Sequence, residues 1–298
     1  MSQYPQQRQA CGAHRGLRRR VLATGALALL SGCSGSRALD LFVPRGTYRR
    51  QEDIGYGADP RQRLDVYLPA QPAGPAPLVV FFYGGSWTRG DRADYRFAGE
   101  ALASAGIVTV LADYRLSPQV GWREILDDCA AATKWSFDHA SSLGATPSRI
   151  FLMGHSAGAY NAAMLALDPQ WLGRQRLAPR QLAGWIGIAG PYDFLPIVDP
   201  ATRVAFDWPR TPAASQPIQH ATGQAPRALL LAARNDSVVD PARNTLGLAR
   251  RLEASGAPVR ARLFERVNHV TVLGALGTPL RWLAPVRSEV TGFLKAAA

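Results

Sequence analysis

The sequence predicts one α/β domain with a mainly parallel central sheet and helices on both of its faces. Short apolar runs alternate along the chain with longer amphipathic segments, as in sheets whose parallel strands are joined by crossover helices. Several runs are apolar at every position, which is typical of strands covered on both sides. The length of 298 residues and the hydrophobic content of 47% fit one such domain, and the sequence contains no internal repeat.

Each element of this sheet is expected from a local signal. Six apolar runs predict the parallel strands, and the segments between them have the spacing of amphipathic helices. The stretch 64–68 predicts an antiparallel hairpin strand that precedes them. The predicted strands are 78–83, 107–113, 150–153, 185–189, 228–232 and 259–264, and the predicted helices are 91–105, 122–139, 157–167, 241–254 and 285–295.

The stretch 191–226 is less regular and contains several prolines and four aromatic residues, Tyr192, Phe194, Phe206 and Trp208. We expect a small cap segment whose aromatic side chains roof a pocket. A surface loop that packs its own aromatic residues is the alternative. Because the sequence holds no large cap domain, such a pocket should suit small to medium substrates.

The pentapeptide GHSAG, from Gly154 to Gly158, lies between the apolar run 150–153 and a stretch of small residues. Gly-x-Ser-x-Gly between a strand and a helix is typical of a nucleophile elbow. A serine hydroxyl is a weak nucleophile at its ordinary pKa, so a sharp turn must raise it to where a base can reach it. The two glycines permit that turn, and Ser156 is therefore the predicted nucleophile.

An acid and a histidine follow in the order that a Ser-Asp-His triad of this kind uses. Asp236 comes after the run 228–232, and His269 comes after the run 259–264. Because the carboxyl ends of parallel strands meet at one edge of a sheet, both side chains should converge on Ser156. Asp240 is a rival acid, but it precedes a proline and has the pattern of a helix N-cap, so we favour Asp236.

The other histidines are weaker candidates for the base. His155 lies inside the elbow and should point away from the hydroxyl of its neighbour. His139 ends an amphipathic helix, His14 lies in the leader, and His220 has the setting of a solvated loop residue.

A second glycine motif, Tyr83-Gly84-Gly85-Ser86-Trp87, closes the strand 78–83. Acyl transfer passes through a tetrahedral oxyanion, and preorganised backbone N–H groups supply a large part of its stabilisation, about 3–4 kcal/mol for each donor. We expect these donors to come from Gly84, Gly85 and Ser86 together with Ala157, the residue after the nucleophile. A Gly-Gly pair that only forms a turn is the alternative.

These motifs resemble those of the α/β-hydrolase serine esterases, in the branch of bacterial carboxylesterases and hormone-sensitive-lipase-like proteins. Besides YGGSW and GHSAG, DYRLSP at 113–118 is similar to the DYRL-x-P stretch of that branch, and GPYD at 190–193 resembles the turn after its sixth strand. The resemblance covers nearly everything from residue 54 onward. It implies the α/β-hydrolase fold and a serine esterase, for which we expect neither cofactor nor metal ion.

Tyr83 departs from that pattern, since many members have histidine before the paired glycines. Backbone N–H groups carry the oxyanion chemistry, so the mechanism implied by the resemblance is unaffected. The preference for the acyl or the alcohol group stays open.

The amino-terminal residues differ in kind from the rest. Three arginines, 18–20, precede the apolar run 21–30, and Leu-Ser-Gly-Cys then ends at Cys33, as in an export signal. Ten apolar residues are too few to span a bilayer, which needs about 20. The LSGC sequence also resembles the lipobox of bacterial lipoproteins, in which the cysteine becomes the lipidated first residue.

We therefore expect three parts: a signal peptide at 1–32, a tether at 33–50 and a catalytic domain at 51–298. The protein would be exported to the cell envelope and held by a lipid on Cys33, facing the periplasm. A soluble periplasmic or secreted protein is the alternative, and the sequence leaves the export route open.

The net charge limits the kinds of partner that the protein can bind, and the cysteine count limits the disulfides it can form. Removal of residues 1–32 takes away five arginines and no acidic residue, so the formal net charge falls from +12 to +7. The remaining arginines are scattered without a basic and aromatic patch, which argues against nucleic acid and leaves an anionic membrane surface as the better partner. Cys129 is the one cysteine after Cys33, so no internal disulfide is expected, and we predict a buried side chain without metal-ligand spacing.

Three classes of function fit these observations. The favoured class is a hydrolase of small to medium carboxylic esters. The second is an amidase of the kynurenine formamidase type, which shares the fold and the Gly-Gly loop. The third is a catalytically silent envelope binding protein, against which the presence of Ser156, Asp236 and His269 argues.

Overall fold

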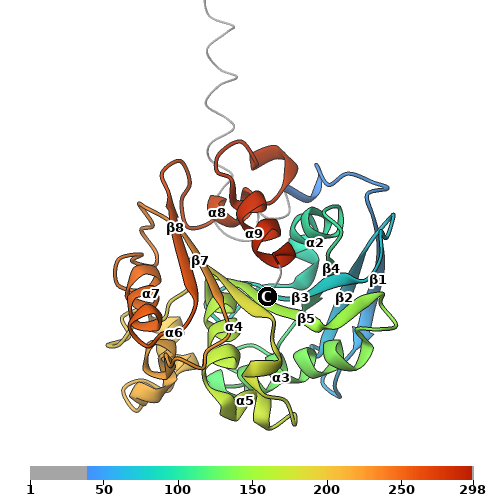
Figure 1. The fold of residues 1–298 in the computed structure, drawn as a ribbon. Coiled ribbons are helices and arrows are strands. Elements are labelled where there is room, and N and C mark those ends of the chain that lie inside the picture. Colours follow the sequence, from blue (N-terminus) through green and yellow to red (C-terminus); the bar gives the residue numbers. More distant parts are fainter. Residues whose placement is uncertain (1–38, 297–298) are drawn as a thin grey trace, which may run out of the picture.

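The computed structural model describes residues 39–296, which fold around one eight-stranded sheet (Figure 1). The predicted signal peptide and Cys33 lie outside the described residues. None of the helices among residues 39–296 has both the length and the apolar character needed to cross a membrane. The strands are β1 (Tyr48–Gly55), β2 (Arg63–Pro69), β3 (Ala76–Phe82), β4 (Val108–Ala112), β5 (Ala145–His155), β6 (Gly184–Ile188), β7 (Ala228–Ala233) and β8 (Val259–Phe264).

The strand order places two loops of the predicted site side by side. The order across the sheet is β1-β2-β4-β3-β5-β6-β7-β8; β2 is antiparallel to β1 and β4, and all other neighbours are parallel. In the register of β3 with β5, Phe82 lies opposite Gly154. The loops that begin at Tyr83 and Ser156 therefore leave the same edge of the sheet as neighbours.

Helices cover both faces of the sheet. In Figure 1, α2 and α9 lie on one face and α3, α4 and α5 on the other. Every residue of α4 is buried, because this helix packs on β5 and β6 and is itself covered by α3. The helices are α2 (Arg96–Ala103), α3 (Trp122–His139), α4 (Ala157–Leu167), α5 (Pro169–Gly173), α6 (Pro200–Ala205), α7 (Thr245–Ala254), α8 (Thr271–Gly274) and α9 (Val286–Lys295).

Most elements lie where local signals predict them. All six predicted parallel strands form, and α3, α4 and β8 have the predicted bounds. The stretch 64–68 forms β2, which is antiparallel as expected but lies between β1 and β4. The predicted helix 91–105 begins with a 3-10 turn, Arg92–Tyr95, and becomes α-helical only at Arg96.

The predicted start of the domain at residue 51 needs correction. β1 begins at Tyr48 and pairs along its length with β2, so the boundary falls inside a strand. The exposed, polar sequence of β1 has no hydrophobic alternation, which is why it was not expected as a strand. The folded domain thus includes residues that the sequence assigned to a tether.

The stretch 191–226 contains α6 and folds inward around its aromatic rings. The ring of Phe206 lies 4.7 Å from that of Trp87 and 5.3 Å from that of Tyr160. Phe194 completes the cluster, at 5.2 Å from Phe206. These rings pack beside α4 and hold the stretch against the core. Most of the stretch is therefore the surface loop that packs its own aromatic residues, which was the alternative to a cap with free aromatic side chains.

Candidate active site

Ser156 occupies a strained turn between β5 and α4. Its φ of 52° and ψ of −121° lie outside the regions that non-glycine residues usually adopt. A Cβ at Gly154 would come within 2.1 Å of the carbonyl oxygen of Gly158, and one at Gly158 within 2.0 Å of that of Phe82. Only glycine fits at either position, and the N–H of Ser156 donates to the carbonyl oxygen of Ile188 at 2.9 Å. The predicted elbow is thus present and held from both sides.

The side chains of Ser156, His269 and Asp236 form one hydrogen-bonded line. His269 Nε2 lies 2.9 Å from Ser156 Oγ, and His269 Nδ1 lies 2.8 Å from Asp236 Oδ2. Asp236 and His269 are each only 8% exposed. The structure therefore brings together three residues that are separated by up to 113 positions in the chain.

Two further contacts fix the carboxylate of Asp236. Its Oδ1 accepts hydrogen bonds from the N–H groups of Val238 and Val239 at 2.9 and 3.0 Å. Burial alone would raise the pKa of Asp236, but the hydrogen bond and charge of His269, together with these two N–H groups, outweigh burial and lower the pKa. Asp236 is accordingly ionised at neutral pH and oriented toward the imidazole.

Asp240, the rival acid, has a different position. Its Oδ1 accepts from the N–H of Ala242 at 2.8 Å and from that of Arg243 at 3.4 Å. Asp240 therefore caps the turn 241–244, and α7 begins only at Thr245, four residues later than predicted. The proline after Asp240 starts a turn that does not continue directly into the helix.

His155 has a role in the geometry that sequence reasoning missed. Its Nε2 lies 2.8 Å from the carbonyl oxygen of His269, and the two rings are 5.1 Å apart. Burial, aided by the charge of His269, lowers the pKa of His155 from 6.5 to about 3, so the ring is neutral and Nε2 donates its proton to that carbonyl. His155 points away from the Ser156 hydroxyl, as expected, but it holds the backbone of the residue that hydrogen-bonds to it.

The glycine loop after β3 lies directly against Ser156. A Cβ at Gly84 would come within 2.9 Å of the Ser156 Cβ, and Gly85 has a φ of 135°. Ser86 and Trp87 follow with φ values of 52° and 60°. Within residues 39–296, the N–H groups of Gly85, Ser86 and Ala157 donate to no acceptor, which leaves them available beside the nucleophile.

Side chains behind this loop fix its position. The hydroxyl of Tyr114 donates to the carbonyl oxygen of Tyr83 at 2.8 Å, and Arg61 Nη2 donates to the Tyr83 hydroxyl at the same distance. Arg61 also bonds to the carbonyl oxygens of Tyr114 and Gly90. On the far side, Trp87 Nε1 donates to Asn161 Oδ1 of α4 at 3.0 Å. Tyr83, the position that departs from the family pattern, is thus an anchor of the loop.

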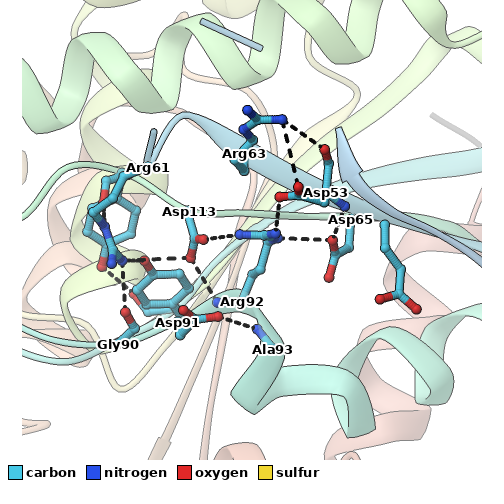
Figure 2. Close-up of polar contacts among 12 residues, drawn as sticks. Asp53, Arg61, Arg63, Asp65, Gly90, Asp91, Arg92, Ala93 and Asp113 are labelled. Atoms are coloured by element: carbon cyan, nitrogen blue, oxygen red, sulfur yellow. Dashed lines mark hydrogen bonds and ion pairs between the residues drawn. The ribbon is translucent and has the colours of Figure 1, made fainter. Parts of the chain in front are cut away.

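Arg61 belongs to a larger charge network that Figure 2 shows in close-up. Arg92 lies among three carboxylates: its Nε is 2.9 Å from Asp65, its Nη2 is 2.9 Å from Asp53, and its Nη1 pairs with Asp113. The side chains of Asp65 and Asp113 are almost fully buried, so Arg92 provides the charge that their burial requires. The network joins β1, β2 and the segment after β4 to the loop that carries Gly84 and Gly85.

A cavity of about 240 Å³ opens beside Ser156 and His269. Its walls are mostly apolar and come from the glycine loop and the start of α2, the elbow at Ser156, Val238 after β7, the segment around α8, and Leu39 at the start of the described residues. None of the residues 191–226 lines it. The prediction that their aromatic side chains roof the pocket is therefore wrong; Phe194 and Phe206 pack instead against Trp87 and Tyr160.

The described residues offer little to a metal ion. Among residues 39–296, no group of three or more His, Cys, Asp or Glu side chains is arranged to hold one. Cys129 is buried, as predicted, and burial raises the pKa of its thiol well above the usual value.

Comparison with known proteins adds a family to this geometry. The family model described as BD-FAE matches residues 64–252. A probable isoprenylcysteine alpha-carbonyl methylesterase of Arabidopsis thaliana is 31% identical over 184 residues, which cover 56% of this chain and 37% of that protein. Esterase LipC of Mycobacterium tuberculosis is 30% identical over 226 residues, which cover 70% of this chain and 56% of that protein. The chain thus spans between about a third and three fifths of these relatives.

Among solved structures, inhibited esterase B from Lactobacillus rhamnosis superposes with a TM-score of 0.74 at 22% identity, over 88% of this chain and 91% of that one. This similarity concerns the fold, and it confirms the predicted α/β-hydrolase architecture.

Proposed function

This chain belongs to the BD-FAE family, and from that premise we propose that it hydrolyses carboxylic esters through an acyl-enzyme on Ser156. One observation carries the proposal: Asp236, His269 and Ser156 are joined by hydrogen bonds of 2.8 and 2.9 Å beside a loop with free N–H groups. The relatives named as esterases support it. A silent binding protein would have no need for a strained serine in this setting.

The geometry is suited to each step of acyl transfer. Ser156 Oγ attacks the ester carbonyl carbon while His269 Nε2 takes its proton, and Asp236 stabilises the imidazolium that forms. The N–H groups of Gly85, Ser86 and Ala157 receive the oxyanion of the tetrahedral intermediate. His269 then returns the proton to the alcohol oxygen as the carbon–oxygen bond breaks.

A water molecule completes the cycle by the same route. His269 removes its proton, the hydroxide attacks the acyl carbonyl, and the proton passes back to Ser156 Oγ as the free acid leaves. The volume of about 240 Å³ favours esters with a small or medium group on the side of α8.

Chemical labelling and a substrate panel test this proposal. A fluorophosphonate probe should label the wild-type protein and leave Ser156→Ala unlabelled; equal labelling of both would place the nucleophile elsewhere. p-Nitrophenyl esters of graded chain length, assayed beside N-formylkynurenine, should give turnover with short and medium esters. Turnover of the formamide alone would favour the amidase.

We further propose that the protein is exported and anchored by a lipid on Cys33. The support is in the sequence: the arginines 18–20, the apolar run 21–30 and the LSGC motif occur in the order of a lipoprotein signal. Two acyl chains on one cysteine would hold the protein firmly to a membrane. Mass spectrometry of the mature amino terminus tests this, and an unmodified terminus in a wholly soluble fraction would overturn it, with Cys33→Ser as the unprocessed control.

A further inference from the structure

The first described residues form part of the pocket. Leu39 lines the cavity beside Ser156, and its Cδ1 lies 3.5 Å from the position of a Cβ on Gly274 of α8. Asp40 accepts a hydrogen bond from the N–H of Phe97 at 3.1 Å, and its carbonyl oxygen accepts one from Arg96 at 2.9 Å. In Figure 1 this blue segment meets the red segment of α8 at one end of the molecule.

Large exposed apolar side chains lie in the segments that line this pocket or within three positions of a lining residue. Val238 and Val270 line the pocket and are nonetheless exposed, Leu41 and Phe42 follow Leu39, and Trp282 follows the lining residue Leu280 by two positions. Leu41 is 83% exposed, Trp282 72%, Val238 68% and Phe42 61%. We call Leu41, Phe42, Val238, Val270 and Trp282 the apolar rim.

The rim accounts for most of the exposed apolar side chains of this size. Within residues 39–296, seven large hydrophobic side chains are exposed, and five of them are the rim. The other two, Val198 and Val204, lie in and next to α6. Exposed apolar side chains that concentrate in the segments of one pocket indicate a surface that contacts an apolar partner.

The short length of chain between Cys33 and Leu39 favours a lipid surface as the partner of the apolar rim. Leu39 follows Cys33 by six positions, and a span of six extended residues reaches about 20 Å at most. A lipid on Cys33 would therefore hold the pocket mouth within about that distance of the bilayer surface. The net charge of +7 after removal of residues 1–32, with Arg89 in the pocket lining, suits an anionic headgroup layer.

We propose that the apolar rim docks on the lipid surface and that the enzyme takes esters dissolved in the membrane. This inference rests on the ester hydrolysis proposed above and names its substrate class. Docking places Leu41, Phe42 and Trp282 among the outer acyl chains and opens the Ser156 pocket toward them. An ester anchored in the bilayer then enters the pocket without crossing water.

The test compares two esters with the same acyl group, because the pocket then contributes equally to both. One is p-nitrophenyl butyrate in water. The other is a fluorogenic butyrate whose alcohol carries a hexadecyl chain, embedded in phosphatidylethanolamine–phosphatidylglycerol vesicles to which the purified full chain is added. The rim variant carries Leu41→Ser, Phe42→Ser and Trp282→Ser, and the matched control carries Val198→Ser and Val204→Ser.

The rim variant should lose about tenfold or more in rate on the embedded ester and keep its rate on the soluble ester. The control should keep both rates. An unchanged rate on the embedded ester, or an equal loss in the control, would overturn the docking proposal. A wild-type dimer in sedimentation that the rim substitutions dissociate would show instead that a second copy covers the rim. Failure of the wild type on the soluble ester contradicts the proposed hydrolysis itself, so the two failures are distinguishable.

Discussion

The two sides of Ser156 differ in what stabilises them. On the side of the glycine loop, Arg61 and Arg92 are hydrogen-bonded to one tyrosine hydroxyl, to carbonyl oxygens and to carboxylates, most of them buried (Figure 2). On the side of His269, the pocket is walled by aliphatic side chains, and Val238 and Val270 are exposed to solvent. One side is dense in charge and satisfied within the chain, and the other is apolar and open.

The contrast between the charged and the apolar side of Ser156 follows from the different task proposed for each. Donors that receive an oxyanion must be fixed in advance, and a paired, buried network fixes a backbone better than mobile surface side chains can. Exposed apolar side chains contribute little to folding, because their surface remains in water. In the proposed reaction the charged side fixes the glycine loop from within, and in the proposed docking the apolar side contacts the lipid surface.

The largest effect on turnover should come from Asp236, which hydrogen-bonds to His269 on the apolar side of Ser156. Asp236→Asn presents the wrong tautomer of His269 to Ser156 and, by analogy with other serine hydrolases, should lower turnover about 10⁴-fold while the protein stays folded. Asp240→Ala, four residues away, should keep turnover and lose about 1 kcal/mol of stability, because it removes only a turn cap. Steady-state kinetics and thermal melting of both variants test the pair. A folded but inactive Asp240→Ala beside an active Asp236→Asn would reverse the assignment.

The next effect concerns His155, which lies between the two sides. The folded protein holds its pKa near 3, against 6.5 in the unfolded chain, so the unfolded state binds more protons between these values. The stability contributed by neutral His155 is complete above pH 6.5 and is lost as the pH falls toward 3. At pH 5 the loss amounts to about 2 kcal/mol. Urea unfolding at pH 8 and pH 5 should show that His155→Gln loses less stability on acidification than the wild type. Equal losses would mean that His155 is already charged or accessible in the folded state.

The smallest effect on activity is expected from a substitution in the charge network behind the glycine loop. Tyr83→Phe removes the hydroxyl that accepts from Arg61, so the glycine loop should loosen and kcat should fall by roughly tenfold, less than the loss of an oxyanion donor, with KM little changed. Tyr56→Phe is the matched control, since the Tyr56 hydroxyl donates to the carbonyl oxygen of Asp113 in the same region but does not touch the loop. Both variants should lose similar stability. Equal kcat values in the two would show that the network serves folding alone.

Local pattern was sufficient for much of this protein. The elbow at Ser156, the paired glycines, α3, α4 and β8 were all predicted at their observed positions, because each depends on neighbouring residues: glycines where a turn is tight and apolar runs where a strand is covered. The order of Ser156, Asp236 and His269 also indicated one site, because parallel strands end at a common edge.

What local pattern could not supply depends on pairing between distant segments. β1 has no hydrophobic alternation of its own, and it forms a strand because it pairs with the edge of β2. His155 hydrogen-bonds to the backbone of a residue 114 positions away, Arg61 donates to the Tyr83 hydroxyl, and the rings of Phe194 and Phe206 pack against Trp87. The sequence by itself predicted the chemistry proposed for Ser156 and determined the class of the fold, since both arise from short-range geometry. Only the tertiary structure decided which side chains hold that chemistry in place and that Leu39 belongs to the pocket, because hydrogen bonds and packing between remote segments leave no periodic trace along the chain.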